Sequence, residues 1–81
     1  MNVRVRLFAV ARQAAGQEAV ELVLPEGATV ADVRRQLAAH VPSLSAMLSR
    51  MLFAVNARVA ADQTIVPADA DVACIPPVSG G

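Results

Sequence analysis

Residues 29–42 read Thr-Val-Ala-Asp-Val-Arg-Arg-Gln-Leu-Ala-Ala-His-Val-Pro and carry the clearest structural signal in the chain. Thr29 and Asp32 have the spacing of a capping box, in which both side chains accept hydrogen bonds from free N–H groups at the start of a helix. Arg34 and Arg35 are expected on the solvent side of that helix. Its apolar residues recur at steps of three and four: Val30, Val33, Leu37 and Val41. The pattern predicts one amphipathic helix that ends before the proline and packs one apolar face against a core.

Two alternating segments precede this helix. Residues 2–9 place valine and leucine on one face and arginine on the other, and residues 19–24 alternate in the same way. A period of two is typical of strands with one buried face. Between them, residues 10–15 contain good helix formers and stop at Gly16, which predicts one or two helical turns.

The second half of the chain predicts more strands. Residues 44–51 have a helical spacing of apolar side chains, with Ser43 as the expected cap. The expected strands are 51–55, a short return at 58–60 after an Asn56-Ala57 turn, and 71–75 after a turn at 68–71. Strands, one main helix and further strands predict an α+β domain.

Two of these strands, 51–55 and 72–75, are apolar on both faces, although one main helix can cover only one side of a sheet. The other side is then either a docking surface for a partner protein, or a surface that loops or the segment 10–15 cover. The sequence leaves both alternatives open.

Length and composition limit the function classes. With 81 residues the chain is expected to form a single domain, residues 1–77, followed by a flexible tail, 78–81. Seven basic and seven acidic residues leave no net charge and no basic stripe, which disfavours nucleic-acid binding. No apolar run approaches the roughly 20 residues that cross a bilayer, no export signal is evident, and a single cysteine cannot form an internal disulfide. A cytoplasmic protein without membrane contact is therefore expected.

The tail reads Pro76-Pro77-Val78-Ser79-Gly80-Gly81. Pro76 and Pro77 cannot donate ladder hydrogen bonds and favour an extended lead-in, which would aim the residues after them. Gly80 and Gly81 lack side chains and can enter a narrow channel, where the main-chain carboxylate of Gly81 can attack an activated phosphate. A frayed end without function is the alternative. The pattern favours Gly81 as the reacting residue.

Three groups of residues together match one family. They are Val5-Arg6-Leu7-Phe8-Ala9 with Arg12 and Gly16, then Val55-Asn56, and the closing residues 76–81. On these residues the whole chain resembles the small sulfur-carrier subunits of molybdopterin synthase. The resemblance implies a ubiquitin-like β-grasp fold, with a mixed sheet of about five strands and one main helix packed on one face.

The resemblance also implies that Gly81 is the site of adenylation and thiocarboxylate formation. An E1-like adenylyltransferase, the activating enzyme, would use ATP and Mg to activate its carboxylate, and a sulfur donor protein would complete the thiocarboxylate. The tail would then enter the large subunit of a heterotetrameric molybdopterin synthase and give its sulfur to a pterin precursor. The resemblance implies that the chain itself binds no metal or cofactor and that the catalytic residues lie on the large subunit. It has no lysine for a phosphate-binding loop of the GxxxxGK type, so the nucleotide must lie on another protein.

Further residues have expected roles. The residues expected to supply docking area for a partner are Phe8, Phe53 and Val78. Where the family commonly has Gly-Asp-Glu before the last strand, this chain has Asp69-Ala70-Asp71, so Asp69 is expected to take a left-handed turn conformation. Cys74 is expected to be a small core residue rather than a sulfur relay. His40 is expected on the surface near the helix C-terminus, without a metal-binding companion.

Three other functions remain open on sequence alone. A β-grasp sulfur carrier of thiamine thiazole or cysteine biosynthesis would share the Gly-Gly tip and the activation step. A ubiquitin-like protein modifier would join the same terminus to lysines of other proteins. A non-covalent interaction module would not use the terminus at all.

Overall fold

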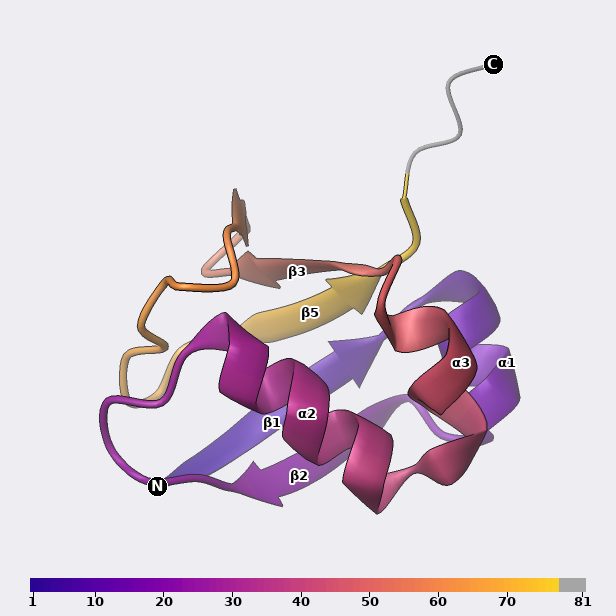
Figure 1. Ribbon diagram of the computed structural model, residues 1–81, viewed down its shortest axis with the longest axis horizontal. Coiled ribbons are helices and arrows are strands. Elements are labelled where there is room, and N and C mark those ends of the chain that lie inside the picture. The colour runs from indigo at the N-terminus through magenta and orange to yellow at the C-terminus, as the bar shows by residue number, and fades with distance from the viewer. Residues whose placement is uncertain (78–81) are drawn as a thin grey trace.

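Five strands form one mixed sheet in the computed structural model, which describes residues 1–77 (Figure 1). The strand order is β2-β1-β5-β3-β4. β5 is the central strand; it is parallel to β1, and all other neighbouring strands are antiparallel. The strands are β1 (Asn2–Leu7), β2 (Ala19–Val23), β3 (Leu52–Val55), β4 (Arg58–Ala60) and β5 (Val72–Ile75). The first and last strands therefore lie side by side, as the expected ubiquitin-like β-grasp requires.

The longest helix, α2 (Val30–His40), lies across one face of the sheet (Figure 1). It begins with the predicted capping box: the Thr29 hydroxyl accepts from the Asp32 N–H at 3.3 Å, and Asp32 Oδ2 accepts from the Thr29 N–H at 2.9 Å. The hydrogen bond from the Thr29 backbone is the main reason that the pKa of the Asp32 carboxyl lies below its ordinary value. Three shorter helices pack together at one end of the sheet: α1 (Ala9–Ala15), η1 (Pro42–Leu44) and α3 (Ser45–Leu48).

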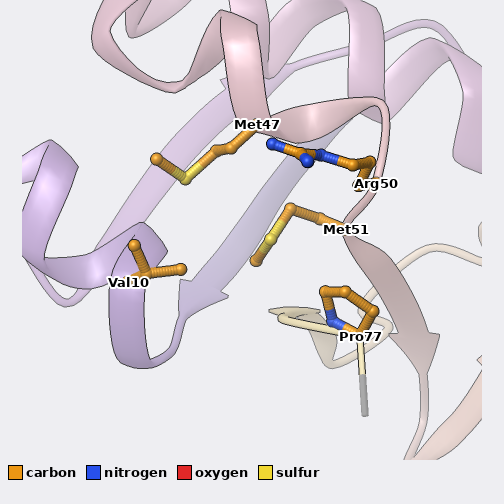
Figure 2. Close-up of a pocket in the computed structure, with 5 residues that line it drawn as sticks. All are labelled: Val10, Met47, Arg50, Met51 and Pro77. Carbon is orange, nitrogen blue, oxygen red and sulfur yellow. The ribbon is translucent and has the colours of Figure 1, made fainter. Parts of the chain in front are cut away.

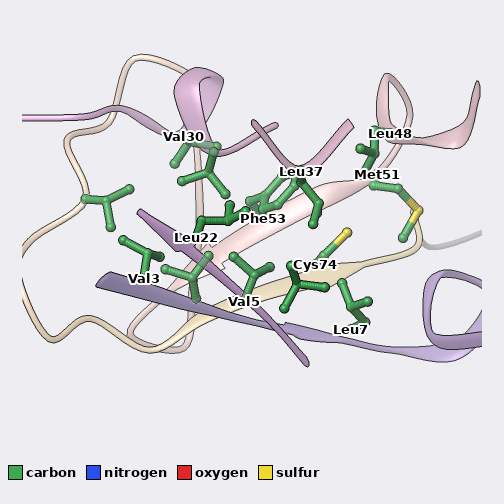
Figure 3. Packing of buried hydrophobic residues seen from close by; sticks show 14 of the residues in the cluster. Val3, Val5, Leu7, Leu22, Val30, Leu37, Leu48, Met51, Phe53 and Cys74 are labelled. Carbon is green, nitrogen blue, oxygen red and sulfur yellow. The ribbon is translucent and has the colours of Figure 1, made fainter. Parts of the chain in front are cut away.

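The core lies between α2 and the sheet (Figure 3). Along β1 the buried residues alternate with exposed ones, as predicted, so valine and leucine face the core and arginine faces away. Phe53 is the largest buried side chain, and it packs beneath α2 in the same cluster as Leu37. Each such side chain contributes about 1.5 to 3 kcal/mol by leaving water. The inner face of the sheet is therefore fully occupied by the helix and its flanking segments.

The structure corrects the predicted exposure of Arg34. Its side chain is 22% exposed, whereas that of Arg35 is 71% exposed. Nη1 of Arg34 donates to the main-chain carbonyls of Leu48 and Met51, the latter at 2.8 Å. Its guanidinium carbon also lies 4.9 Å from the centroid of the Phe53 ring. The long stem lets the charged group turn along the helix surface and join α2 to the segment that leads into β3.

The predicted cap at Ser43 is also wrong. Ser43 Oγ donates to the carbonyl of Ala14 at 3.0 Å and thereby ties η1 to α1. Pro42 begins η1 instead, since its fixed φ suits the first helical position and its missing N–H would have no helical acceptor there.

Two turns use left-handed backbone conformations without glycine. Asn56 and Ala57 have φ of 51° and 68° and connect β3 to β4. Two successive positive φ angles are typical of the type I′ hairpin turn, which matches the twist of the strands it joins. Asp69 has φ of 61°, which confirms its predicted place before β5.

We expect Ala57→Gly to stabilise the domain by about 1 kcal/mol, because a left-handed conformation is strained by the alanine Cβ. The exposed helix residue Ala39 supplies an opposite control: Ala39→Gly should destabilise by roughly 1 kcal/mol. Urea unfolding measures both changes. Equal destabilisation by the two substitutions would contradict the turn assignment.

The face of the sheet away from α2 has its own apolar surface. Facing pairs across the ladders place Ala73 beside Arg6 and Ala54, and place Val59 beside Ala54. Leu52 and Ile75 form a neighbouring pair on the same side. We call the part of this surface that runs from the end of β1 over β5 and β3 to β4 the outer face; its apolar residues are Phe8, Leu52, Ala54, Val59, Ala73 and Ile75.

The segment 10–15 does not cover the outer face. Its one buried residue, Ala11, belongs to the inner core together with the buried residues of α2, η1 and α3. Val59 remains 64% exposed and Phe8 36% exposed. The alternative in which this segment covers the second apolar face is therefore wrong.

Candidate functional site

The tail begins at the end of the central strand of the sheet. β5 has a paired strand on each side, and its last ladder partner is Leu52, opposite Ile75. Pro76 and Pro77 follow directly and have no N–H with which to continue the ladder. Because β5 is held on both sides, the point where the tail begins has a fixed position beside α1 and α3 (Figure 1).

The predicted reacting end of the tail, Val78, Ser79, Gly80 and Gly81, lies outside the described residues. Its predicted roles therefore stay predictions. Pro76 is half-buried and Pro77 is exposed at the edge of the domain.

Phe8 lies on the outer face close to the start of the tail. Its N–H donates to the carbonyl of Cys74 at 3.2 Å, which fixes its main chain beside β5. The guanidinium of Arg6 lies 5.2 Å from the centroid of the Phe8 ring. Arg6 is itself held by two hydrogen bonds to Asp71, at 2.9 and 2.7 Å. A partly exposed aromatic ring with a fixed neighbour is accessible to a partner, and the docking role of Phe8 stays a prediction.

The predicted docking role of Phe53 is wrong. Its side chain is 1% exposed and lies in the core (Figure 3). The Arg34 guanidinium lies over its ring. β3 is apolar on both faces, so its sequence did not reveal which side chains point outward. The residues of this strand on the outer face are Leu52 and Ala54. Sequence reasoning also missed Val59, because the short strand β4 carries little alternation.

Cys74 is a core residue, as expected. Its side chain is fully buried, and this burial raises the pKa of the thiol from 9.0 to about 11, with a smaller opposing effect of the Arg34 charge. A buried neutral thiol is a poor nucleophile. We expect iodoacetamide at neutral pH to leave the folded protein unmodified and to alkylate Cys74 only in denaturant, as measured by intact mass. Rapid alkylation under native conditions would contradict this placement.

Other classes of site find little support in the part of the chain that the structure describes. Within residues 1–77, no three His, Cys, Asp or Glu side chains gather into a group that could hold a metal ion. His40 is exposed at the end of α2. Across the same residues no helix has the length and apolar character needed to span a bilayer.

The fold is similar to those of several solved structures. SAMP1 from Haloferax volcanii, a small archaeal modifier protein, superposes with a TM-score of 0.88 at 27% identity and full coverage of both chains. A complex of subunits 1 and 2 of the molybdopterin-converting factor from Helicobacter pylori contains a chain with the same fold. That chain superposes with a TM-score of 0.69 at 21% identity, and the match covers all of it and all of the present chain.

Sequence comparison agrees with the structural comparison. The molybdopterin synthase sulfur carrier subunit of Arabidopsis thaliana is 35% identical over 81 residues, which cover all of this chain and 84% of that protein. The ThiS family model matches residues 5–81, a span that includes the second half of β1, the outer face and the whole tail. The chain with this sheet, helix and tail therefore belongs to the ThiS family of ubiquitin-like β-grasp proteins.

Proposed function

We propose that this protein is the sulfur carrier of molybdopterin synthase and that Gly81 carries the sulfur. The observation that supports this most directly is the position of the tail, which begins at a central strand held on both sides and ends in two residues without side chains. The name of the Arabidopsis thaliana relative supports the pathway.

The proposed chemistry uses only the terminal carboxylate. Its oxygen attacks the α-phosphorus of ATP on the activating enzyme, and pyrophosphate leaves with the formation of an acyl adenylate. A donor of sulfide-level sulfur then attacks the acyl carbon, AMP leaves, and a thiocarboxylate forms. In the large subunit, the thiocarboxylate sulfur attacks an electrophilic carbon of the pterin precursor and displaces an oxygen substituent from it. Hydrolysis of the resulting thioester breaks the acyl C–S bond, which leaves the sulfur on the pterin and returns the carboxylate. No side chain of this protein has to act as an acid or base.

The partners of the proposed cycle follow from that chemistry. ATP and Mg belong to the activating enzyme, because this chain lacks a phosphate-binding loop. The large synthase subunit would dock on the outer face, where Phe8 is partly exposed, with Val78 as a further contact at the start of the tail. Such a cycle would run in the cytoplasm, and its last step, transfer of sulfur to the pterin precursor, would take place within a heterotetramer of small and large subunits.

The decisive experiment is intact-mass measurement of protein isolated from cells that are supplied with molybdate and a sulfur source. We expect a species in which one oxygen is replaced by sulfur, and we expect the loaded protein to bind the large synthase subunit. A protein lacking Gly81 is the control and should show no such species. Failure of the native protein to acquire sulfur while cofactor synthesis continues would contradict the proposal.

A protein modifier is the second candidate, favoured by the structural similarity to SAMP1 of Haloferax volcanii. It predicts a ladder of tagged conjugates in cells that disappears when Gly81 is deleted. Carriers of thiamine thiazole or cysteine biosynthesis share the family and would co-purify with a thiazole or cysteine synthase instead of the large synthase subunit.

A further inference from the structure

A pocket of about 330 Å³ lies beside the start of the tail (Figure 2). Its walls come from segments that are distant in sequence, namely α1, α3, the link to β3, and the residues after β5. The five lining residues are Val10, Met47, Arg50, Met51 and Pro77. The pocket is thus separate from the outer face, although both lie close to the start of the tail.

The pocket is apolar except for one charged group at its edge. Val10 is 46% exposed on α1, and Met51 at the base is 3% exposed. The exposed side chain of Arg50 makes no ion pair with any of residues 1–77, whereas four other arginines of this region do. An apolar depression with an unpaired guanidinium is complementary to an apolar side chain that has a carboxylate beside it.

The pocket walls are held in place by the protein itself. Arg34 donates to the carbonyls of Leu48 and Met51 and so fixes the main chain on both sides of Arg50. The hydrogen bond from Ser43 to Ala14 ties α1 to η1, which leads directly into α3 on the other side of the opening. A pocket formed before binding avoids part of the ordering cost of association. The two methionine side chains can still adapt to the shape of an occupant.

We propose that this pocket is a docking point for the large synthase subunit, and that it receives a bulky apolar side chain of that subunit with a neighbouring carboxylate paired to Arg50. The inference rests on the proposed function and adds a second contact to it. A small metabolite fits less well, because small-molecule sites use several placed polar groups and this one has a single polar side chain.

Because Pro77 lines the pocket, a partner bound there also affects the path of the tail. Residues 78–81 can extend about 13 Å beyond the domain, at roughly 3.3 Å per residue. A partner side chain packed against Pro77 would fix the direction in which the chain leaves the domain. The number of positions open to Gly81 then falls, which favours entry into a channel of the same partner.

Methionine methyl groups provide a direct probe of the pocket. The chain has three methionines; two line the pocket, and Met1 lies at the other end of β1 as an internal control. The full chain with ¹³C-methyl methionine is titrated with purified large subunit and observed by NMR. We expect large shifts for Met47 and Met51 and a smaller change for Met1.

Each other result of this titration is informative. Binding that leaves Met47 and Met51 unshifted overturns this inference and leaves the proposed function intact. Absence of binding overturns both. Shifts on deletion of residues 78–81 without partner show that the chain's own tail occupies the pocket, and shifts on dilution show that a second copy does; either result replaces the proposed occupant.

Two substitutions test the chemistry of the occupant. Arg50→Glu should raise the Kd for the large subunit at least about tenfold, since it replaces attraction of a carboxylate by repulsion. Val10→Trp should weaken binding similarly by filling the opening. Arg58→Glu is the matched control, because Arg58 is also exposed and makes no ion pair with residues 1–77, but lies on β4 away from the pocket. Equal effects of Arg50→Glu and Arg58→Glu, with unchanged thermal stability, would rule out a specific carboxylate at the pocket.

Discussion

A chain with one alanine added after Gly81 is expected to lose all detectable thiocarboxylate and all support of molybdenum-cofactor assembly. The reason is that the added residue moves the reacting carboxylate beyond Gly81 and introduces a Cβ into a tip that otherwise has no side chain. Intact mass after sulfur loading, together with cofactor content in a strain that lacks the native protein, measures both losses. The fold should be unaffected, because residues 1–77 form the sheet and helices without the tip.

A matched control separates the carboxylate from the rest of the tail. Ser79→Ala changes the tail but leaves the Gly81 carboxylate in place, so sulfur loading should persist. If the extended chain still supports cofactor assembly while mass spectrometry shows that its alanine remains, Gly81 is not the reacting residue. A non-covalent interaction module would give that result.

Arg34→Met is expected to lower the free energy of unfolding by about 3 kcal/mol, a large effect for a residue that the sequence places on a helix surface. The substitution leaves the carbonyls of Leu48 and Met51 without their donor and removes the cation from above the Phe53 ring. The ion pair with Asp62, at 2.7 Å, adds little because Asp62 is half exposed. Urea unfolding measures the change, and the midpoint of thermal unfolding should fall by roughly 10 to 20 °C.

Arg35→Met is the control for the change of charge and side-chain type. Arg35 is 71% exposed and, among residues 1–77, pairs only with Asp32 one turn earlier, so its loss should cost less than about 0.5 kcal/mol. Equal stability of the two variants would show that Arg34 does not join α2 to the segment before β3. Because the same hydrogen bonds fix the pocket wall, Arg34→Met should also broaden the Met47 and Met51 methyl signals.

The contrast between Arg34 and Arg35 shows where sequence reasoning stops. The apolar period of α2 correctly assigned its buried face, and the spacing of Thr29 and Asp32 correctly assigned its start. Neither signal separates two adjacent arginines at the edge of that face. Their roles differ because carbonyl groups some 15 residues later in the chain come within reach of only one of them.

The strands show the same limit. Alternation in β1 and β2 correctly predicted their buried residues, because polar side chains separate the buried ones: Arg4 and Arg6 in β1, and Glu21 in β2. β3 and β5 are apolar on both faces, so their sequences do not show which alternate residues face the core. The prediction that Phe53 points outward was wrong for this reason. The pocket beside the tail could not be predicted at all, since its five residues meet only when four segments pack together.

The sequence by itself determined the features that depend on neighbours within a few residues: the capped helix, the turn at Asp69, and a tail whose last two residues have no side chains. Those features follow from local backbone sterics and short-range hydrogen bonds. Only the tertiary structure decided that β5 lies between β1 and β3, that Arg34 donates to the segment before β3, and that Phe53 is buried while Phe8 is partly exposed. Such features depend on pairing and packing between distant segments, and many pairings satisfy the same local pattern until one of them buries all the apolar faces together.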